Sequence, residues 1–110
     1  MPVHPIGTLM DSHAIYGRGL KIYNGVHIGP YKAFGVKPSE MVHPQFGDGV
    51  ILLANSIIYG NCKIGDNVIV SARTVIINED IPSNCIVMGQ SPDLKALPNK
   101  HNNLGIFNFD

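Results

Sequence analysis

Residues 46–81 read FGDGVI LLANSI IYGNCK IGDNVI VSARTV IINEDI when they are divided into units of six. Each unit opens on a large apolar residue, and these openers are Phe46, Leu52, Ile58, Ile64, Val70 and Ile76. Four places after the openers stand mostly small or β-branched residues, namely Val50, Ser56, Cys62, Val68, Thr74 and Asp80. Neither the helical period nor the two-residue period of a strand produces this spacing. A six-residue repeat with Gly, Asn and Asp corners is typical of a parallel β-helix, in which inward residues stack on their equivalents one coil away.

The same phase extends towards the N-terminus. It gives openers at Ile28, Ile22, Tyr16, Met10 and His4. The pattern fails over residues 30–43, where prolines and lysines are frequent and Glu40 falls on an opener position, at which a buried carboxylate is costly. We therefore predict one all-β domain over residues 1–110, with repeats at 4–29 and 44–89, and a protruding loop at 30–43 that is a candidate functional element.

Beyond the repeat, Pro82 closes the regular pattern and residues 85–89 look like one last strand. Residues 91–100 are expected to form a short helix or cap over the open end, so that residues 90–110 make up a C-terminal cap and tail.

Composition excludes several classes of function. Eight basic and eight acidic residues give a formal net charge of +0, which favours neither nucleic acid nor a membrane surface. No apolar run is long enough for a membrane span, and the first residues lack the features of a signal peptide, so we expect a cytoplasmic protein. Two cysteines, Cys62 and Cys85, are expected to be buried thiols rather than a disulfide.

Two motif-bearing segments resemble a known family. Residues 43–89, which begin His43-Pro44-Gln45-Phe46-Gly47-Asp48-Gly49-Val50 and include IGDNV and DIPSN, resemble the C-terminal half of the hexapeptide-repeat acyltransferases. Within that family they are most similar to serine acetyltransferases and capsular-sugar O-acetyltransferases. Upstream, HPIG at 4–7 and VHIG at 26–29 resemble the family stretch between its catalytic histidine and a loop. The resemblance implies a left-handed parallel β-helix, a homotrimer, and acetyl transfer from acetyl-CoA to a hydroxyl of serine or a sugar.

The resemblance also implies roles for individual residues. His4 matches the catalytic base, and His43 matches the histidine that follows the loop and faces the acceptor. In the family these two histidines come from adjacent subunits. Imidazole suits the task because its unperturbed pKa lies near neutral pH. Each histidine also has a purely structural interpretation, as an end-of-solenoid residue or as part of a loop exit.

Coenzyme A is expected to lie along two corners of the repeat. Ala54 and Ala72 match the family's small corner residues, and Arg73 either crowds the groove or binds a phosphate of coenzyme A. Leu53 replaces a family glycine at the same groove. In addition, only three residues precede His4, so the family's acid that orients the base is expected to be lacking unless Asp11 or a neighbouring subunit supplies one.

These departures keep an alternative open, in which the chain is a non-catalytic β-helix scaffold or assembly module. We expect no metal, because the histidine spacing lacks the close pair seen in the zinc site of γ-class carbonic anhydrases, which share the fold. His13 and His27 are interpreted as solvated corner residues.

Overall fold

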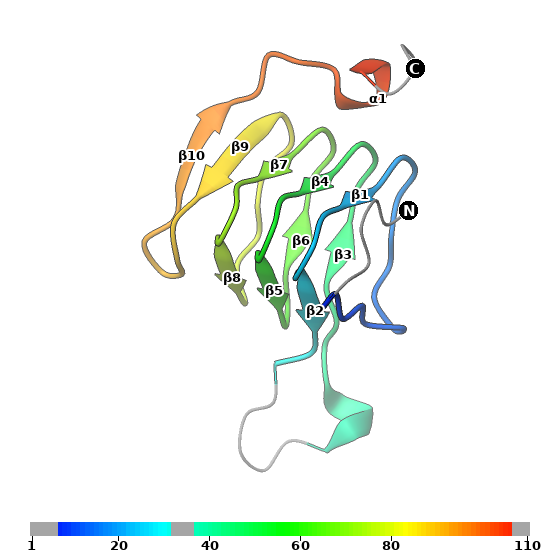
Figure 1. Cartoon of the computed structure of the whole chain (residues 1–110). Coiled ribbons are helices and arrows are strands. Elements are labelled where there is room, and N and C mark those ends of the chain that lie inside the picture. Colours follow the sequence, from blue (N-terminus) through cyan, green and yellow to red (C-terminus); the bar gives the residue numbers. More distant parts are fainter. Residues whose placement is uncertain (1–6, 32–36, 107–110) are drawn as a thin grey trace.

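The computed structural model describes residues 7–31 and 37–106, and within them the chain winds into a left-handed parallel β-helix with three faces (Figure 1). Face A contains β1 (Lys21–Ile22), β4 (Ile51–Leu52), β7 (Ile69–Val70), β9 (Cys85–Met88) and β10 (Lys95–Pro98). Face B contains β2 (His27–Gly29), β5 (Ile57–Tyr59) and β8 (Val75–Ile77), and face C contains β3 (Gln45–Phe46) and β6 (Lys63–Ile64). The two helical segments are η1 (Pro38–Glu40), a 3-10 turn in the loop, and α1 (Asn103–Ile106) near the C-terminus.

The register confirms the six-residue repeat. Ile51 pairs with Ile69 and Ile57 pairs with Val75, each 18 positions further along the chain. One coil is therefore three units long, with one unit for each face. All six openers of the central stretch point inward and are at most 4% exposed. Their stacked side chains form the hydrophobic core, which removes apolar surface from water along the whole axis.

The last coil is one residue shorter than the others. Ile64 pairs with Ile81, and Val70 pairs with Val87, in each case 17 positions on. As a result Ile81, and not Pro82, takes the inward place one coil on from Ile64, and the side chain of Asp80 is exposed. Exposure of this side chain avoids the cost of burying a charge.

The N-terminal coils follow the predicted phase less completely. Ile22 and Ile28 are buried, Tyr16 is half-buried, and Met10 is exposed. His4 lies outside the described residues. Met10 belongs to the first coil that the structure describes, so within the described residues a neighbouring coil covers it on one side only.

The loop after β2 is an insertion of two whole units. Lys21 pairs with Ile51, 30 positions on, whereas the next coil advances by 18, so the insertion adds 12 residues. It projects from the end of β2 and returns through η1 to β3 (Figure 1). Because 12 is a multiple of six, the chain re-enters face C in phase.

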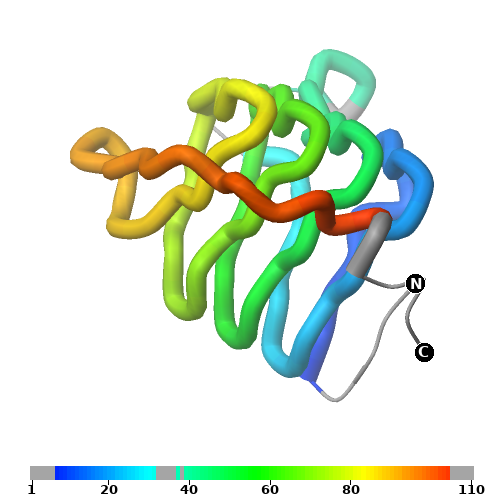
Figure 2. The backbone as a smooth tube through the Cα atoms, turned by 90° about the horizontal axis from the view of Figure 1, so that it is seen from above, coloured from blue at the N-terminus to red at the C-terminus, as the bar shows by residue number. Residues whose placement is uncertain are grey.

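The C-terminal residues give a strand where a helix or cap was expected. Strand β10 pairs antiparallel with β9 and extends face A. The chain then turns back over the corner between faces C and A, and Figure 2 shows residues 99–104 running across successive coils. We call residues 99–104 the C-terminal strap.

Hydrogen bonds attach the strap to several coils. Asn103 is fully buried, and its side-chain amide donates to the Gly49 carbonyl at 2.7 Å. Its backbone N–H donates to Asn67 Oδ1 at 2.7 Å, and the Asn99 N–H donates to the Asn84 carbonyl at 2.9 Å. Leu104 packs over Gly19, where a Cβ would lie 2.3 Å from Leu104 Cδ2. Gly19 also has a φ of +68°, a backbone conformation that favours glycine.

Both cysteines are free and buried, as expected. No helix in the described ranges has the length and apolar character that crossing a membrane requires.

Candidate functional site

His43 is positioned where the loop rejoins the β-helix. The neighbouring carbonyl of Pro44 accepts a hydrogen bond from the Ile15 N–H at 3.1 Å, and the Phe46 N–H donates to the Ile15 carbonyl at 2.8 Å. These bonds attach the segment after the loop to the preceding coil on both sides of Gln45. The backbone around His43 is therefore held by sheet-type pairing although its side chain faces the loop.

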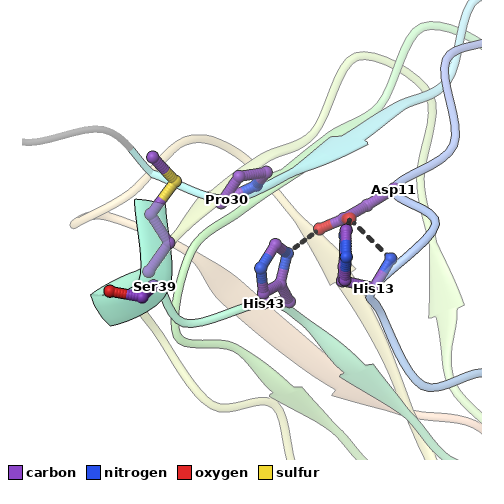
Figure 3. A pocket seen from close by; sticks show the side chains of 6 residues that line it. Asp11, His13, Pro30, Ser39 and His43 are labelled. Carbon is purple, nitrogen blue, oxygen red and sulfur yellow. Dashed lines mark hydrogen bonds and ion pairs between the residues drawn. The ribbon is translucent and has the colours of Figure 1, made fainter. Parts of the chain in front are cut away.

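A buried carboxylate meets the His43 ring. Asp11 Oδ2 lies 2.5 Å from His43 Nδ1, and the two side chains are 4% and 23% exposed. A contact between a carboxylate and imidazole at this distance is a strong, charge-assisted hydrogen bond. It commits Nδ1 of His43 to Asp11 and leaves Nε2 as the nitrogen that is free to meet a substrate (Figure 3).

Asp11 is itself fixed by its neighbours. Its Oδ1 accepts the His13 backbone N–H at 2.9 Å, and its carbonyl accepts the Tyr16 hydroxyl at 2.7 Å. The Tyr16 ring stacks on Phe46, with centroids 5.4 Å apart. Burial and then the charge of Asp11 raise the pKa of Tyr16 to about 12, against the smaller opposing effect of its bond to the Asp11 carbonyl, so the phenol remains a donor at neutral pH. The carboxylate thus has a defined orientation.

His13 completes the group. Its ring centroid lies 5.0 Å from that of His43, with 34° between the ring planes, and its side chain is 77% exposed. Figure 3 shows both imidazoles next to the Asp11 carboxylate. His13 was expected at a solvated corner, and its ring is exposed but also borders the pair formed by Asp11 and His43.

These residues open into a cavity of about 720 Å³ between the N-terminal coil and the loop. The cavity is lined by Asp11, His13, Pro30, Ser39, Met41 and His43. It is large enough for a small organic substrate. An imidazole with one nitrogen held by a carboxylate presents its other nitrogen in a fixed direction, which suits it to bind an acceptor hydroxyl or to act as a general base.

The other predicted site residues lie elsewhere in the fold or beyond the described ranges. His4 falls in the latter group. Ala54, Ala72 and Arg73 share one corner between faces B and A, where the Arg73 N–H donates to the Ala54 carbonyl at 3.0 Å. Ala72 and Arg73 are exposed, and none of the three lines the cavity around His43. Within the described part of the chain, Arg73 forms no ion pair, which leaves its guanidinium available to a ligand.

The fold and the repeat match known proteins. A family model described as "Bacterial transferase hexapeptide (six repeats)" matches residues 43–78. The serine acetyltransferase of Synechococcus elongatus is 35% identical over 86 residues, which are 78% of this chain and 33% of that protein. The chain therefore spans about a third of the length of such curated relatives.

Solved structures give the same result. The Neisseria gonorrhoeae serine acetyltransferase in complex with serine superposes with a TM-score of 0.70 at 33% identity, over 88% of this chain and 36% of that one. A serine acetyltransferase solved with CoA superposes with a TM-score of 0.71 at 22% identity, over 88% of this chain and 36% of that one, and shows the likeness of fold. By its repeat, its fold and its sequence, the chain is a hexapeptide-repeat β-helix that is similar to the corresponding part of the serine acetyltransferases.

Proposed function

We propose that this protein transfers an acetyl group from acetyl-CoA to the hydroxyl of a small acceptor, with serine as the first candidate and a sugar as the second. The observation that carries the proposal is the pair of Asp11 and His43 at the mouth of a cavity of about 720 Å³. Serine is preferred because relatives at 33–35% identity are serine acetyltransferases, one of them solved with serine. The two free cysteines suit a reducing compartment, so we place the reaction in the cytoplasm.

In the proposed mechanism His43 holds the acceptor. With Nδ1 hydrogen-bonded to Asp11, Nε2 accepts a hydrogen bond from a second donor of the acceptor, such as the amino group of serine or a neighbouring hydroxyl of a sugar. This contact orients the reacting hydroxyl and leaves its proton to the base. As that oxygen attacks the thioester carbon, a base must take the proton, and the C–S bond must break to release the thiol of CoA. We assign the base to His4 of an adjacent subunit in a homotrimer, on the family resemblance, and His4 then protonates the departing thiolate.

Coenzyme A is proposed to lie along the corner formed by Ala54 and Ala72. Small side chains let a pantetheine arm approach the backbone there, and the exposed Arg73 supplies a cation for a phosphate group. We thus expect Arg73→Ala to raise the KM for acetyl-CoA while the KM for the acceptor stays the same.

Thiol release from acetyl-CoA, measured with serine and with a panel of sugars, tests the proposal. We expect His43→Ala to lower kcat/KM by roughly a hundredfold or more, as the loss of a general acid–base or acceptor-holding group does. His101→Ala removes an exposed histidine that does not line the cavity and is the matched control. An absence of both turnover and CoA binding in the folded protein would instead support the non-catalytic scaffold.

A further inference from the structure

We propose that Asp11, His13 and His43 form a zinc site at the mouth of the cavity. Each of the three residues offers one ligand atom, and these atoms all lie within 4.8 Å of one another. The proposal goes beyond acetyl transfer and does not depend on it, because it concerns the binding of a metal ion to the resting protein. The histidine spacing in the sequence had predicted no metal site.

The distances between the candidate ligand atoms lie on either side of the spacing found in a zinc site. Zinc binds imidazole nitrogen and carboxylate oxygen at about 2.0–2.2 Å, so neighbouring ligand atoms in a tetrahedral site are about 3.3 Å apart. In the structure His43 Nδ1 lies 2.5 Å from Asp11 Oδ2, and His13 Nδ1 lies 3.9 Å from Asp11 Oδ1. The pair of His43 and Asp11 must therefore separate by about 0.8 Å, and His13 must approach the other two ligands, which lie within 4.8 Å of it. His13 is able to make this movement because its side chain is exposed and its contact with the Ser12 hydroxyl is long, at 3.4 Å.

The carboxylate is prepared for a cation. Asp11 is buried, and two donors fix its position. The His13 backbone N–H donates to its Oδ1 atom, and the Tyr16 hydroxyl donates to its backbone carbonyl. Such outer contacts orient a ligand before the metal arrives, and they are a general feature of metal sites. In the described ranges no lysine or arginine forms an ion pair with Asp11, so imidazole and a metal ion are its available cationic partners.

The donor set selects zinc over the hard cations. Two imidazole nitrogens with one carboxylate oxygen suit Zn²⁺, whereas Mg²⁺ and Ca²⁺ prefer oxygen ligands throughout. Three protein ligands leave the fourth position of a tetrahedral zinc open. That position would face the cavity, where a water molecule or a small anion has room to bind.

Direct metal binding to the full-length protein without a histidine tag tests the site. Isothermal titration with Zn²⁺ should show one ion per chain, and the d–d absorption of the Co²⁺ form should report a four- or five-coordinate site with nitrogen ligands. We expect His13→Ala to weaken binding by at least about tenfold, since the loss of even an outer partner costs this much. His13 is exposed, so its replacement should leave the fold intact.

A control and a second variant keep the test decisive. His101→Ala deletes an exposed histidine outside the cluster and should leave the affinity unchanged. Asp11→Asn, checked for folding by circular dichroism, should weaken binding as His13→Ala does. Equal affinity in wild type and His13→Ala, or an octahedral Co²⁺ spectrum, would overturn the site. Because no step of the test uses acetyl-CoA, its outcome is separate from that of the acetyl-transfer assay.

Discussion

Asp11 Oδ2 and His43 Nδ1 lie 2.5 Å apart although 32 positions separate the two residues in the chain. The contact joins the N-terminal coil to the segment that leaves the loop. It is the only ion pair in the described ranges in which both side chains are less than a quarter exposed. The conformation of the loop exit is therefore coupled to that of the first coil.

Replacement of Asp11 by Asn should destabilise the fold. The variant keeps an acceptor for the His13 N–H but removes the charge that binds His43, and we expect a cost of about 1–3 kcal/mol in the free energy of unfolding. Urea denaturation followed by circular dichroism measures it. Asp48→Asn is the control, because Asp48 pairs with Arg18 at an exposed site and should cost well under about 1 kcal/mol. Equal effects of the two variants would contradict this assignment.

Ser56→Ala should stabilise the protein. The Ser56 hydroxyl is completely buried and has no hydrogen-bond partner within the described part of the chain. Removing a buried polar group that makes no bond recovers its desolvation penalty, about 1 kcal/mol. Thr74→Ala, at the equivalent position one coil on, is the contrast, since the Thr74 hydroxyl donates to the Val87 carbonyl at 3.5 Å. The midpoint of urea unfolding should rise for Ser56→Ala alone, and a fall would show that the hydroxyl is bonded in solution.

Asn103→Ala should release the C-terminal strap. The side chain donates to the Gly49 carbonyl at 2.7 Å from a fully buried position, so its loss leaves a buried carbonyl unpaired at a cost of about 1–3 kcal/mol. Limited proteolysis should then cut between β10 and α1 faster than in the wild type. His101→Ala shortens an exposed side chain of the same strap and is the control for local sequence effects. Unchanged cleavage in Asn103→Ala would show that the strap is held by other contacts.

The protein should lose stability in mildly alkaline solution. Burial raises the pKa of Cys62 and of Cys85 above the ordinary thiol value of 9.0. The unfolded chain therefore releases these protons at a lower pH than the folded chain, and the stabilisation is complete below pH 9.0 and declines above it. Urea midpoints compared between neutral pH and pH 10 measure the decline, to which Tyr16 also begins to contribute because its pKa is raised from 10.0 to about 12.

Cys62→Ala provides the matching variant. It should flatten the decline between pH 9 and 10 because one of the titrating groups is gone, whatever the variant does to stability at neutral pH. A decline as steep as that of the wild type would assign the effect to groups other than Cys62.

The six-residue period predicted which residues of the central coils are buried, because inward stacking is a local consequence of the repeat. The regular period would put Pro82 one coil on from Ile64, where the structure has Ile81, because a period carries no information about a coil that is one residue short. It also left the form of residues 91–100 open, where an antiparallel strand follows β9. The strand at 95–98 forms because β9 offers it a free edge on face A. The short-range pattern of the sequence carries no information about that edge.

Only part of the site could be predicted from the sequence, for a related reason. His43 was identified by its place after the loop, but its neighbours depend on how many units the loop inserts. An insertion of no unit, one unit or two units would stack Tyr31, Lys37 or His43 over His13, and all three keep the same phase. The structure has two units, since Ile15 pairs with Gln45 at the same interval of 30 that separates His13 from His43. The sequence places His13 and His43 at equivalent positions of the repeat. It does not give the number of six-residue units in the loop, which decides whether the two histidines lie side by side.

The strap has a consequence for how the molecule unfolds. In a simple solenoid each coil contacts only its neighbours, so the ends can fray while the middle remains folded. Here a segment of six residues reaches the corners at Gly19, Gly49, Asn67 and Asn84. Opening the last coil therefore also breaks contacts made to the earlier coils. The strap converts a stack of independent turns into one cooperative unit that should unfold in a single transition.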